Sequence, residues 1–101
     1  MSEEKIVVNI DPDLKDLIPG FLENRGKDIE NMKSALSAND SDSLKSIGHS
    51  IKGVGGGYGF AEITEIGAEI EECARLNDME SITKLIDNLA DYLSRVEIKY
   101  Q

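Results

Sequence analysis

The stretch His49-Ser-Ile-Lys-Gly-Val-Gly-Gly-Gly-Tyr-Gly-Phe60 decides the fold, and it contains the one histidine of the 101-residue chain. If residues 41–58 are helical, their large apolar side chains recur at spacings of three and four, which is typical of a single buried stripe. The stripe consists of Leu44, Ile47, Ile51, Val54 and Tyr58. At about 100° per residue, His49 lies on the opposite side of the helix. We therefore expect a helix that buries its apolar side and directs His49 to solvent.

The outward face of this helix also carries the residues around His49, namely Asp42, Lys45, Lys52, Gly53 and Gly56. An exposed imidazole is a good nucleophile when neutral, and it is partly protonated near physiological pH. The two lysines could attract an anion, and the two glycines leave room for a partner to approach. The simpler interpretation is that a lone helical histidine is only a solvated or capping residue.

Five glycines occupy the seven positions from Gly53 to Gly59. Each costs about 1 kcal/mol relative to alanine inside a helix, so propensity alone would end the helix near Lys52 and leave a loop. Val54 and Tyr58 nevertheless stay in phase with the apolar stripe, and we expect packing to hold the helix through this run. Inward glycines would then let a neighbouring helix approach closely. A phosphate-cradling loop is the weaker interpretation, because the sequence has neither a Gly-Lys-Ser/Thr ending nor a preceding strand.

Three further segments show the same helical periodicity. We expect them to form helices over residues 19–38, 61–76 and 79–98. The stripe of the last one comprises Ile82, Ile86, Leu89, Leu93, Val96 and Tyr100. Four amphipathic helices joined by turns of two to four residues specify an all-α fold, an antiparallel up-down-up-down four-helix bundle. The stripes are used up inside such a bundle, so we expect a monomer.

The N-terminal residues precede the bundle. We expect residues 1–10 to form an extended arm packed on the bundle, because the sequence offers no other strand that could pair with them as a sheet. Asp11 and Pro12 are typical of a helix cap and a first helical position, which predicts a short extra helix over residues 12–18. The bundle domain would then span residues 11–101.

The motif His49-x-x-Lys52-Gly53, followed by Gly59 after five further residues, resembles the active-site helix of histidine-containing phosphotransfer (HPt) domains. The family pattern has leucine where this chain has Ile51, which is a mild departure. The resemblance extends to the helical layout over roughly residues 11–100. It implies an HPt-like four-helix bundle with His49 as the phosphoacceptor.

Glu71 is a candidate partner for His49. In a hairpin of two helices centred near Phe60, each of these two residues lies eleven positions from the turn, so they share one height. A carboxylate that accepts a hydrogen bond from Nδ1–H would leave Nε2 as the nucleophile. The resemblance agrees, because several HPt domains place Glu or Gln at this distance. Alternatively, Glu71 is a solvated acid in a run that also contains Glu69 and Glu72.

Composition excludes several classes of function. Lysine and arginine number 11 and aspartate and glutamate 20, which gives a net charge of −9. Nucleic-acid binding needs a basic face, so we expect no such partner. The N-terminus lacks the pattern of a signal peptide and no apolar run is long enough to span a membrane, so we expect a cytoplasmic chain without a membrane partner. One cysteine and one histidine argue against a metal site, and we expect no metal and no cofactor.

The resemblance implies a phosphocarrier that passes a phosphoryl group between His49 and the aspartate of a receiver domain, either of a response regulator or of a hybrid sensor histidine kinase. Lys52 is placed to stabilise the phosphoryl charge. Gly53, Gly56 and, more weakly, Lys45 would form the receiver docking face. Without a nucleotide site, the chain would be a transfer intermediate and not an enzyme. Two alternatives stay open, a helical adaptor that is not phosphorylated and a phosphatase.

Overall fold

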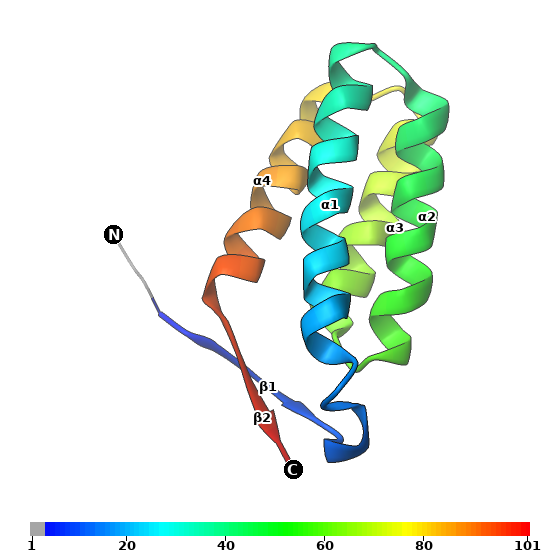
Figure 1. The fold of residues 1–101 in the computed structure, drawn as a ribbon. Helices are drawn as coiled ribbons and strands as arrows, with labels where there is room; N and C mark the ends of the chain where they lie inside the picture. The colour runs from blue at the N-terminus through cyan, green and yellow to red at the C-terminus, as the bar shows by residue number, and fades with distance from the viewer. Residues whose placement is uncertain (1–3) are drawn as a thin grey trace.

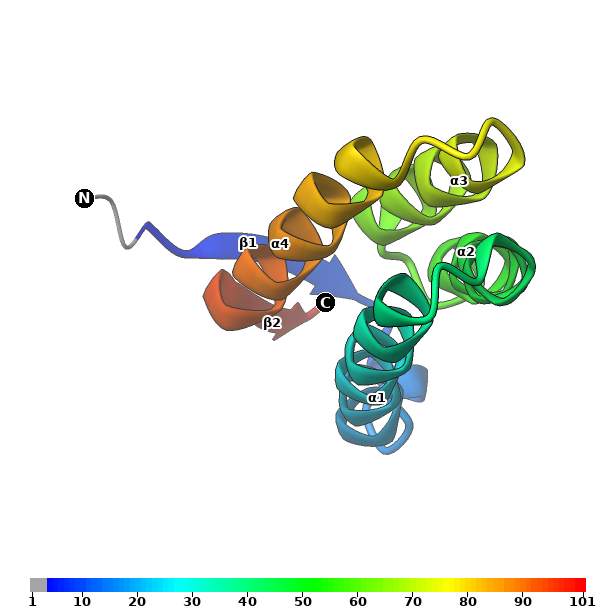
Figure 2. The same cartoon turned by 90° about the horizontal axis from the view of Figure 1, so that it is seen from above.

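The computed structural model describes residues 4–101, and in this part of the chain it has four α-helices and a two-stranded sheet (Figure 1). The helices are α1 (Ile18–Ser37), α2 (Ser41–Gly57), α3 (Ala61–Arg75) and α4 (Met79–Arg95). Seen from above, they follow one another around a shared core (Figure 2). The predicted helical segments are therefore present, and the helix that carries His49 continues through the glycine run to Gly57.

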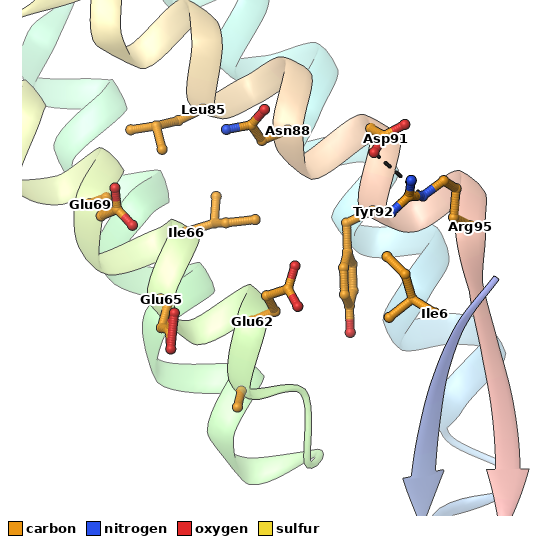
Figure 3. Close-up of a pocket in the computed structure, with 11 residues that line it drawn as sticks. Ile6, Glu62, Glu65, Ile66, Glu69, Leu85, Asn88, Asp91, Tyr92 and Arg95 are labelled. Carbon is orange, nitrogen blue, oxygen red and sulfur yellow. Dashed lines mark ion pairs between the residues drawn. The ribbon is translucent and has the colours of Figure 1, made fainter. Parts of the chain in front are cut away.

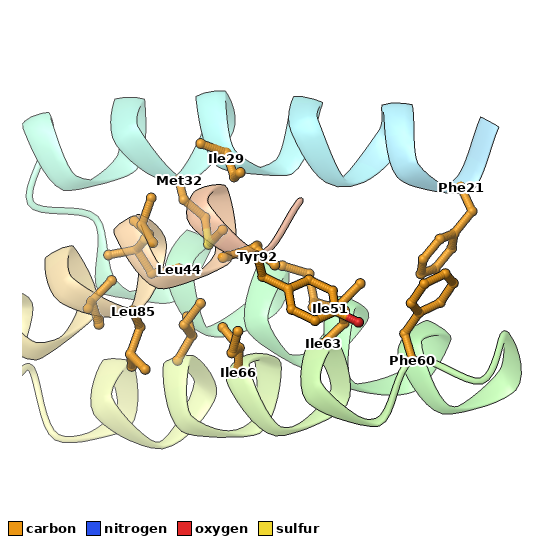
Figure 4. Packing of buried hydrophobic residues seen from close by; sticks show 14 of the residues in the cluster. Phe21, Ile29, Met32, Leu44, Ile51, Phe60, Ile63, Ile66, Leu85 and Tyr92 are labelled. Carbon is orange, nitrogen blue, oxygen red and sulfur yellow. The ribbon is translucent and has the colours of Figure 1, made fainter. Parts of the chain in front are cut away.

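The core is built mainly from isoleucine, leucine and aromatic side chains that all four helices direct inward (Figure 4). At one end, the ring of Phe21 in α1 stacks on Tyr58 and Phe60 at centroid distances of 4.6 and 5.0 Å. These two rings flank Gly59, whose φ of +89° suits a residue without a side chain. The stack thus anchors the glycine-rich end of α2, where helix propensity is weakest.

Aspartates begin two of the helices. The Oδ1 atoms of Asp40 and Asp78 accept hydrogen bonds from the backbone N–H groups of Ser43 and Ser81, at 3.1 and 3.2 Å. Each aspartate thereby satisfies a donor that the first turn of its helix leaves free. These caps fix where α2 and α4 begin, and so they set the position of His49 along the bundle.

The expected all-α fold is wrong in one respect, because β1 (Ile6–Ile10) pairs in parallel with β2 (Val96–Tyr100). The N-terminal arm therefore has a sheet partner, and the last helix ends at Arg95 instead of near residue 98. Residues 96–100 alternate apolar and charged side chains, and this period of two is typical of a half-buried strand. Val96 and Tyr100 also continue the spacing of the α4 stripe, which is why the helical interpretation extended too far.

The expected short helix over residues 12–18 is also wrong. Only Pro12–Leu14 form a single 3₁₀ turn, which Asp11 caps as expected. Pro19 lies in the first turn of α1, where the missing N–H costs nothing, so it starts the long helix and does not separate two helices. Among the described residues, no helix is both long and apolar enough to cross a membrane.

Candidate functional site

The site depends on an unusually close contact between α2 and α3. A Cβ added to Gly48 would lie 2.7 Å from the backbone nitrogen of Glu71, and one added to Gly67 would lie 2.5 Å from that of Lys52. A Cβ at Gly55 would lie 2.8 Å from the nitrogen of Thr64. Real Cβ atoms do not approach other atoms so closely, so glycine is required at these three buried positions. The two backbones therefore touch beside the histidine.

His49 lies on the outward side of α2, as the apolar stripe predicts, with 69% of its side chain exposed. Its Nδ1 atom lies 3.0 Å from Oε2 of Glu71 on α3, a hydrogen-bond distance. A carboxylate only accepts hydrogen bonds, so this contact selects the tautomer that carries its proton on Nδ1. No other residue in the described part of the chain hydrogen-bonds the ring, which leaves Nε2 facing solvent.

Lys52 meets the same carboxylate, since its Nζ lies 3.1 Å from Oε1 of Glu71. Glu71 thus bridges the imidazole and the ammonium group, with one oxygen on each. The hydrogen bond from Lys52 is the largest cause of the lowered pKa of the Glu71 carboxyl. Burial, the next largest, opposes it, and the contact with His49 lowers the pKa further. The carboxyl group is therefore held ionised, the form that accepts a hydrogen bond from Nδ1–H.

The glycines of the outward face differ in how open they are. Nothing lies within 4 Å of a Cβ added to Gly53, whereas one at Gly56 would touch Thr64 Oγ1 at 3.5 Å. Both residues are exposed, in keeping with a face that a partner could approach. Lys45 lies apart from the carboxylate and lines a shallow depression beside His49 and Glu71.

Sequence reasoning missed two features of this site. The ion pair between Lys52 and Glu71 was not expected, because counting residues from the turn matches Glu71 with His49 alone. Ser46, which lines the same depression as Lys45, was also passed over. It lies three residues before His49, and that spacing places both on one face of a helix, so a search by spacing could have found it. Within residues 4–101, no three His, Cys, Asp or Glu side chains lie close enough together to hold a metal ion.

The comparisons with known proteins agree with this picture at the level of the family. The family model of the Hpt domain matches residues 16–98, which is most of the chain. No curated protein and no solved structure matches the sequence. The match covers all of α1 to α4 and includes His49, Lys52 and Glu71. The chain belongs to the Hpt domain family.

Proposed function

We propose that this chain is a phosphocarrier in which Nε2 of His49 accepts a phosphoryl group and passes it to or from the aspartate of a receiver domain. Hpt domains serve phosphotransfer in phosphorelays and interact with receiver domains. The observation that carries the proposal for this chain is the state of the one imidazole. It is exposed, its Nδ1 is held by Glu71, and its Nε2 is free.

The chemistry follows from that arrangement. The lone pair of Nε2 attacks the phosphorus of an aspartyl phosphate, the P–O bond to the aspartate breaks, and the carboxylate leaves. The ring then carries a proton on Nδ1 and a phosphoryl group on Nε2, so it is formally cationic before the phosphoryl charge is counted. An ionised Glu71 beside Nδ1 stabilises that cation and keeps the ring in one orientation.

Lys52 has a second role in the proposal. In the unphosphorylated chain its ammonium group is paired with Glu71. A phosphoryl group on Nε2 brings up to two negative charges within reach of a side chain one helical turn away, and we propose that Lys52 then shares its charge with the phosphoryl oxygens. Both contacts lie at the surface, so the exchange costs little desolvation.

The receiver would dock on the outward face of α2. Gly53 gives the clearance there, Gly56 continues it, and Lys45 adds positive charge at the edge. The proposal includes a monomeric domain over residues 11–101 and an antiparallel up-down-up-down order of helices, which the three-residue turns at 38–40, 58–60 and 76–78 favour. Transfer would need no nucleotide site, since the partner supplies the phosphoryl group.

The test is phosphorylation of the purified chain by acetyl phosphate or phosphoramidate, followed by intact mass measurement. We expect one acid-labile, base-stable phosphate that is absent in His49→Gln, whose helix content by circular dichroism stays unchanged. If no donor reacts, the same measurement is repeated with a phosphorylated receiver domain. A folded chain that binds the receiver without taking phosphate from it would overturn the proposal in favour of an adaptor.

A further inference from the structure

A groove of about 550 Å³ lies away from His49, between α3, α4 and the start of β1 (Figure 3). Its floor is apolar and includes Ile66 and Leu85, which are 8% and 9% exposed. Its rim on the α3 side is acidic, with Glu62, Glu65 and Glu69 on successive turns. The groove therefore combines a band of negative charge with a narrow apolar floor.

Within residues 4–101, no basic side chain pairs with the acidic rim on α3. Arg95 is the basic side chain that lines the groove, and it pairs at 3.6 Å with Asp91 on its own helix (Figure 3). In the part of the chain that the structure describes, Glu62, Glu65 and Glu69 have no ion pair. Three carboxylates on one helix face repel one another unless a cation lies between them.

A second observation is the hydroxyl group of Tyr92. The side chain is only 3% exposed, yet its hydroxyl has no hydrogen-bond partner among residues 4–101. Tyr92 lines the groove, and Figure 3 shows its ring extending from α4 between Glu62 and Ile6. Burial and the nearby Glu62 carboxylate raise the pKa of this phenol to about 12, so it stays neutral and can both donate and accept. The hydroxyl oxygen is itself accessible at the surface of the groove, near Glu62, so a ligand in the groove can form a hydrogen bond with it.

The groove and His49 lie on opposite sides of α3. Glu62 and Glu71 are nine residues apart, which places them about 180° from each other around the helix. A partner in the groove would therefore leave the imidazole free. Binding in the groove would therefore be independent of the proposed phosphotransfer.

We propose that this groove binds a basic segment of a partner protein, with an arginine side chain entering between the α3 carboxylates and the Tyr92 hydroxyl. A planar guanidinium has five donors, enough to serve two carboxylates and a phenol oxygen together. An apolar residue next to the arginine would cover Ile66 and Leu85. The chemistry excludes a phosphate-bearing or nucleic-acid ligand, because the rim would repel it.

The probe is a fluorescein-labelled peptide with three Gly-Arg-Leu repeats, compared with the same peptide in which citrulline replaces each arginine. Citrulline keeps the shape of arginine and removes its charge. Binding is measured by fluorescence anisotropy in 0.15 M NaCl, a salt concentration that screens nonspecific attraction to an acidic protein. We expect the arginine peptide to bind at least tenfold more tightly than the citrulline peptide, with amide NMR shifts gathered on the groove side of α3 and α4.

Two double variants remove the same charge from different faces. Glu62→Gln with Glu65→Gln should weaken binding of the arginine peptide at least tenfold. Glu23→Gln with Glu30→Gln, on exposed positions of α1, should weaken it less than twofold. Tyr92→Phe keeps the ring and should weaken binding about threefold, while His49→Gln should leave it unchanged. Equal losses in the two double variants, or peptide shifts centred on His49, would overturn the proposal.

Discussion

The two faces of α3 meet their neighbours in different ways. Toward α2, Gly67 brings backbone against backbone, so that an added Cβ would lie 2.5 Å from the nitrogen of Lys52. Toward α4, side chains such as Ile66, Leu85 and Tyr92 hold the helices apart and leave a groove. Because the backbones of α2 and α3 are in contact, His49 and Glu71 are held at the same level of the bundle, with Nδ1 and Oε2 at hydrogen-bond distance. The open face leaves surface that a partner can fill.

Removal of the close contact should have the largest effect. In Gly67→Ala the new Cβ meets backbone atoms of Lys52 and Gly48, which cannot move like the end of a side chain. Overpacking of about 3 kcal/mol, less about 1 kcal/mol gained in helix propensity, predicts a net loss of about 2 kcal/mol in the free energy of unfolding. Thermal denaturation should show a fall of roughly 10 °C in Tm.

Gly26→Ala is the matched control for this measurement. Nothing lies within 4 Å of a Cβ added there, in the middle of α1, so the propensity term acts alone and Tm should rise. A Gly67→Ala variant as stable as Gly26→Ala would mean that α2 and α3 are not in close backbone contact.

The next largest effect is expected on the rate of phosphorylation, when the contact between Glu71 and His49 is removed. Glu71→Ala removes the acceptor from Nδ1 of His49 and should slow phosphorylation by acetyl phosphate about tenfold, or about 1.4 kcal/mol in activation free energy. Glu71→Gln keeps a hydrogen-bond acceptor for Nδ1, so its phosphorylation rate should fall less than that of Glu71→Ala. Glu72→Ala removes a carboxylate one position along, where it pairs with Arg75 and not with His49, and should leave the rate unchanged. Equal phosphorylation rates for Glu71→Ala and Glu72→Ala would show that Glu71 does not contribute to the reactivity of His49.

The two contacts of Glu71 can be separated by titration. Its carboxyl pKa lies below the ordinary value of 4.5, with Lys52 as the first cause and His49 as a smaller one. A lowered pKa in the folded state means that Glu71 contributes stability above about pH 4.5, and that this contribution is lost as the pH falls through the folded-state value. Lys52→Met should therefore raise the pKa of Glu71 more than His49→Gln does, as measured by carbon-13 NMR of the carboxyl group. The reverse order would place His49 as its main partner.

Features set by the spacing along a helix, or by counting residues outward from a short turn, were predictable from the sequence. The outward direction of His49 followed from the phase of the apolar stripe, and its height relative to Glu71 followed from counting outward from Phe60. Each of these inferences uses only local spacing, which the 3.6-residue period transmits along a helix.

Features that depend on distant segments were not predictable in this way. The partner of β1 lies at the other end of the chain. The sequence of residues 96–100 fits both a helical stripe and a strand, and only the pairing with β1 distinguishes the two. The groove depends on how α4 packs against α3, which cannot be predicted from the spacing of residues within either helix. The contacts of Glu71 with His49 and Lys52 depend on the close approach of the α2 and α3 backbones at Gly67, which the spacing within either helix does not show.

Gly53→Ala tests the outward face of α2, and we expect it to change the free energy of unfolding less than Gly67→Ala does. Its Cβ meets nothing within 4 Å, so helix propensity should raise the free energy of unfolding by up to about 1 kcal/mol. Phosphotransfer from a receiver should slow, more so in Gly53→Gln, while labelling by acetyl phosphate stays unchanged because that donor is small. A slower reaction with both donors would indicate damage to His49 itself and not to docking.

Tyr92→Phe tests the open face and should have the smallest effect on stability. The unfolded chain hydrates the phenol, whereas in the folded chain the nearly buried side chain has no partner for its hydroxyl among residues 4–101. Loss of that hydroxyl should therefore leave the free energy of unfolding unchanged or raise it by about 0.5 to 1 kcal/mol. Denaturant titration measures this, with Tyr100→Phe in β2 as a second tyrosine for comparison. A clear loss of stability in Tyr92→Phe alone would show that the hydroxyl already has a hydrogen-bond partner in the free protein. The groove side of α3 would then have no unpartnered hydroxyl to offer a ligand.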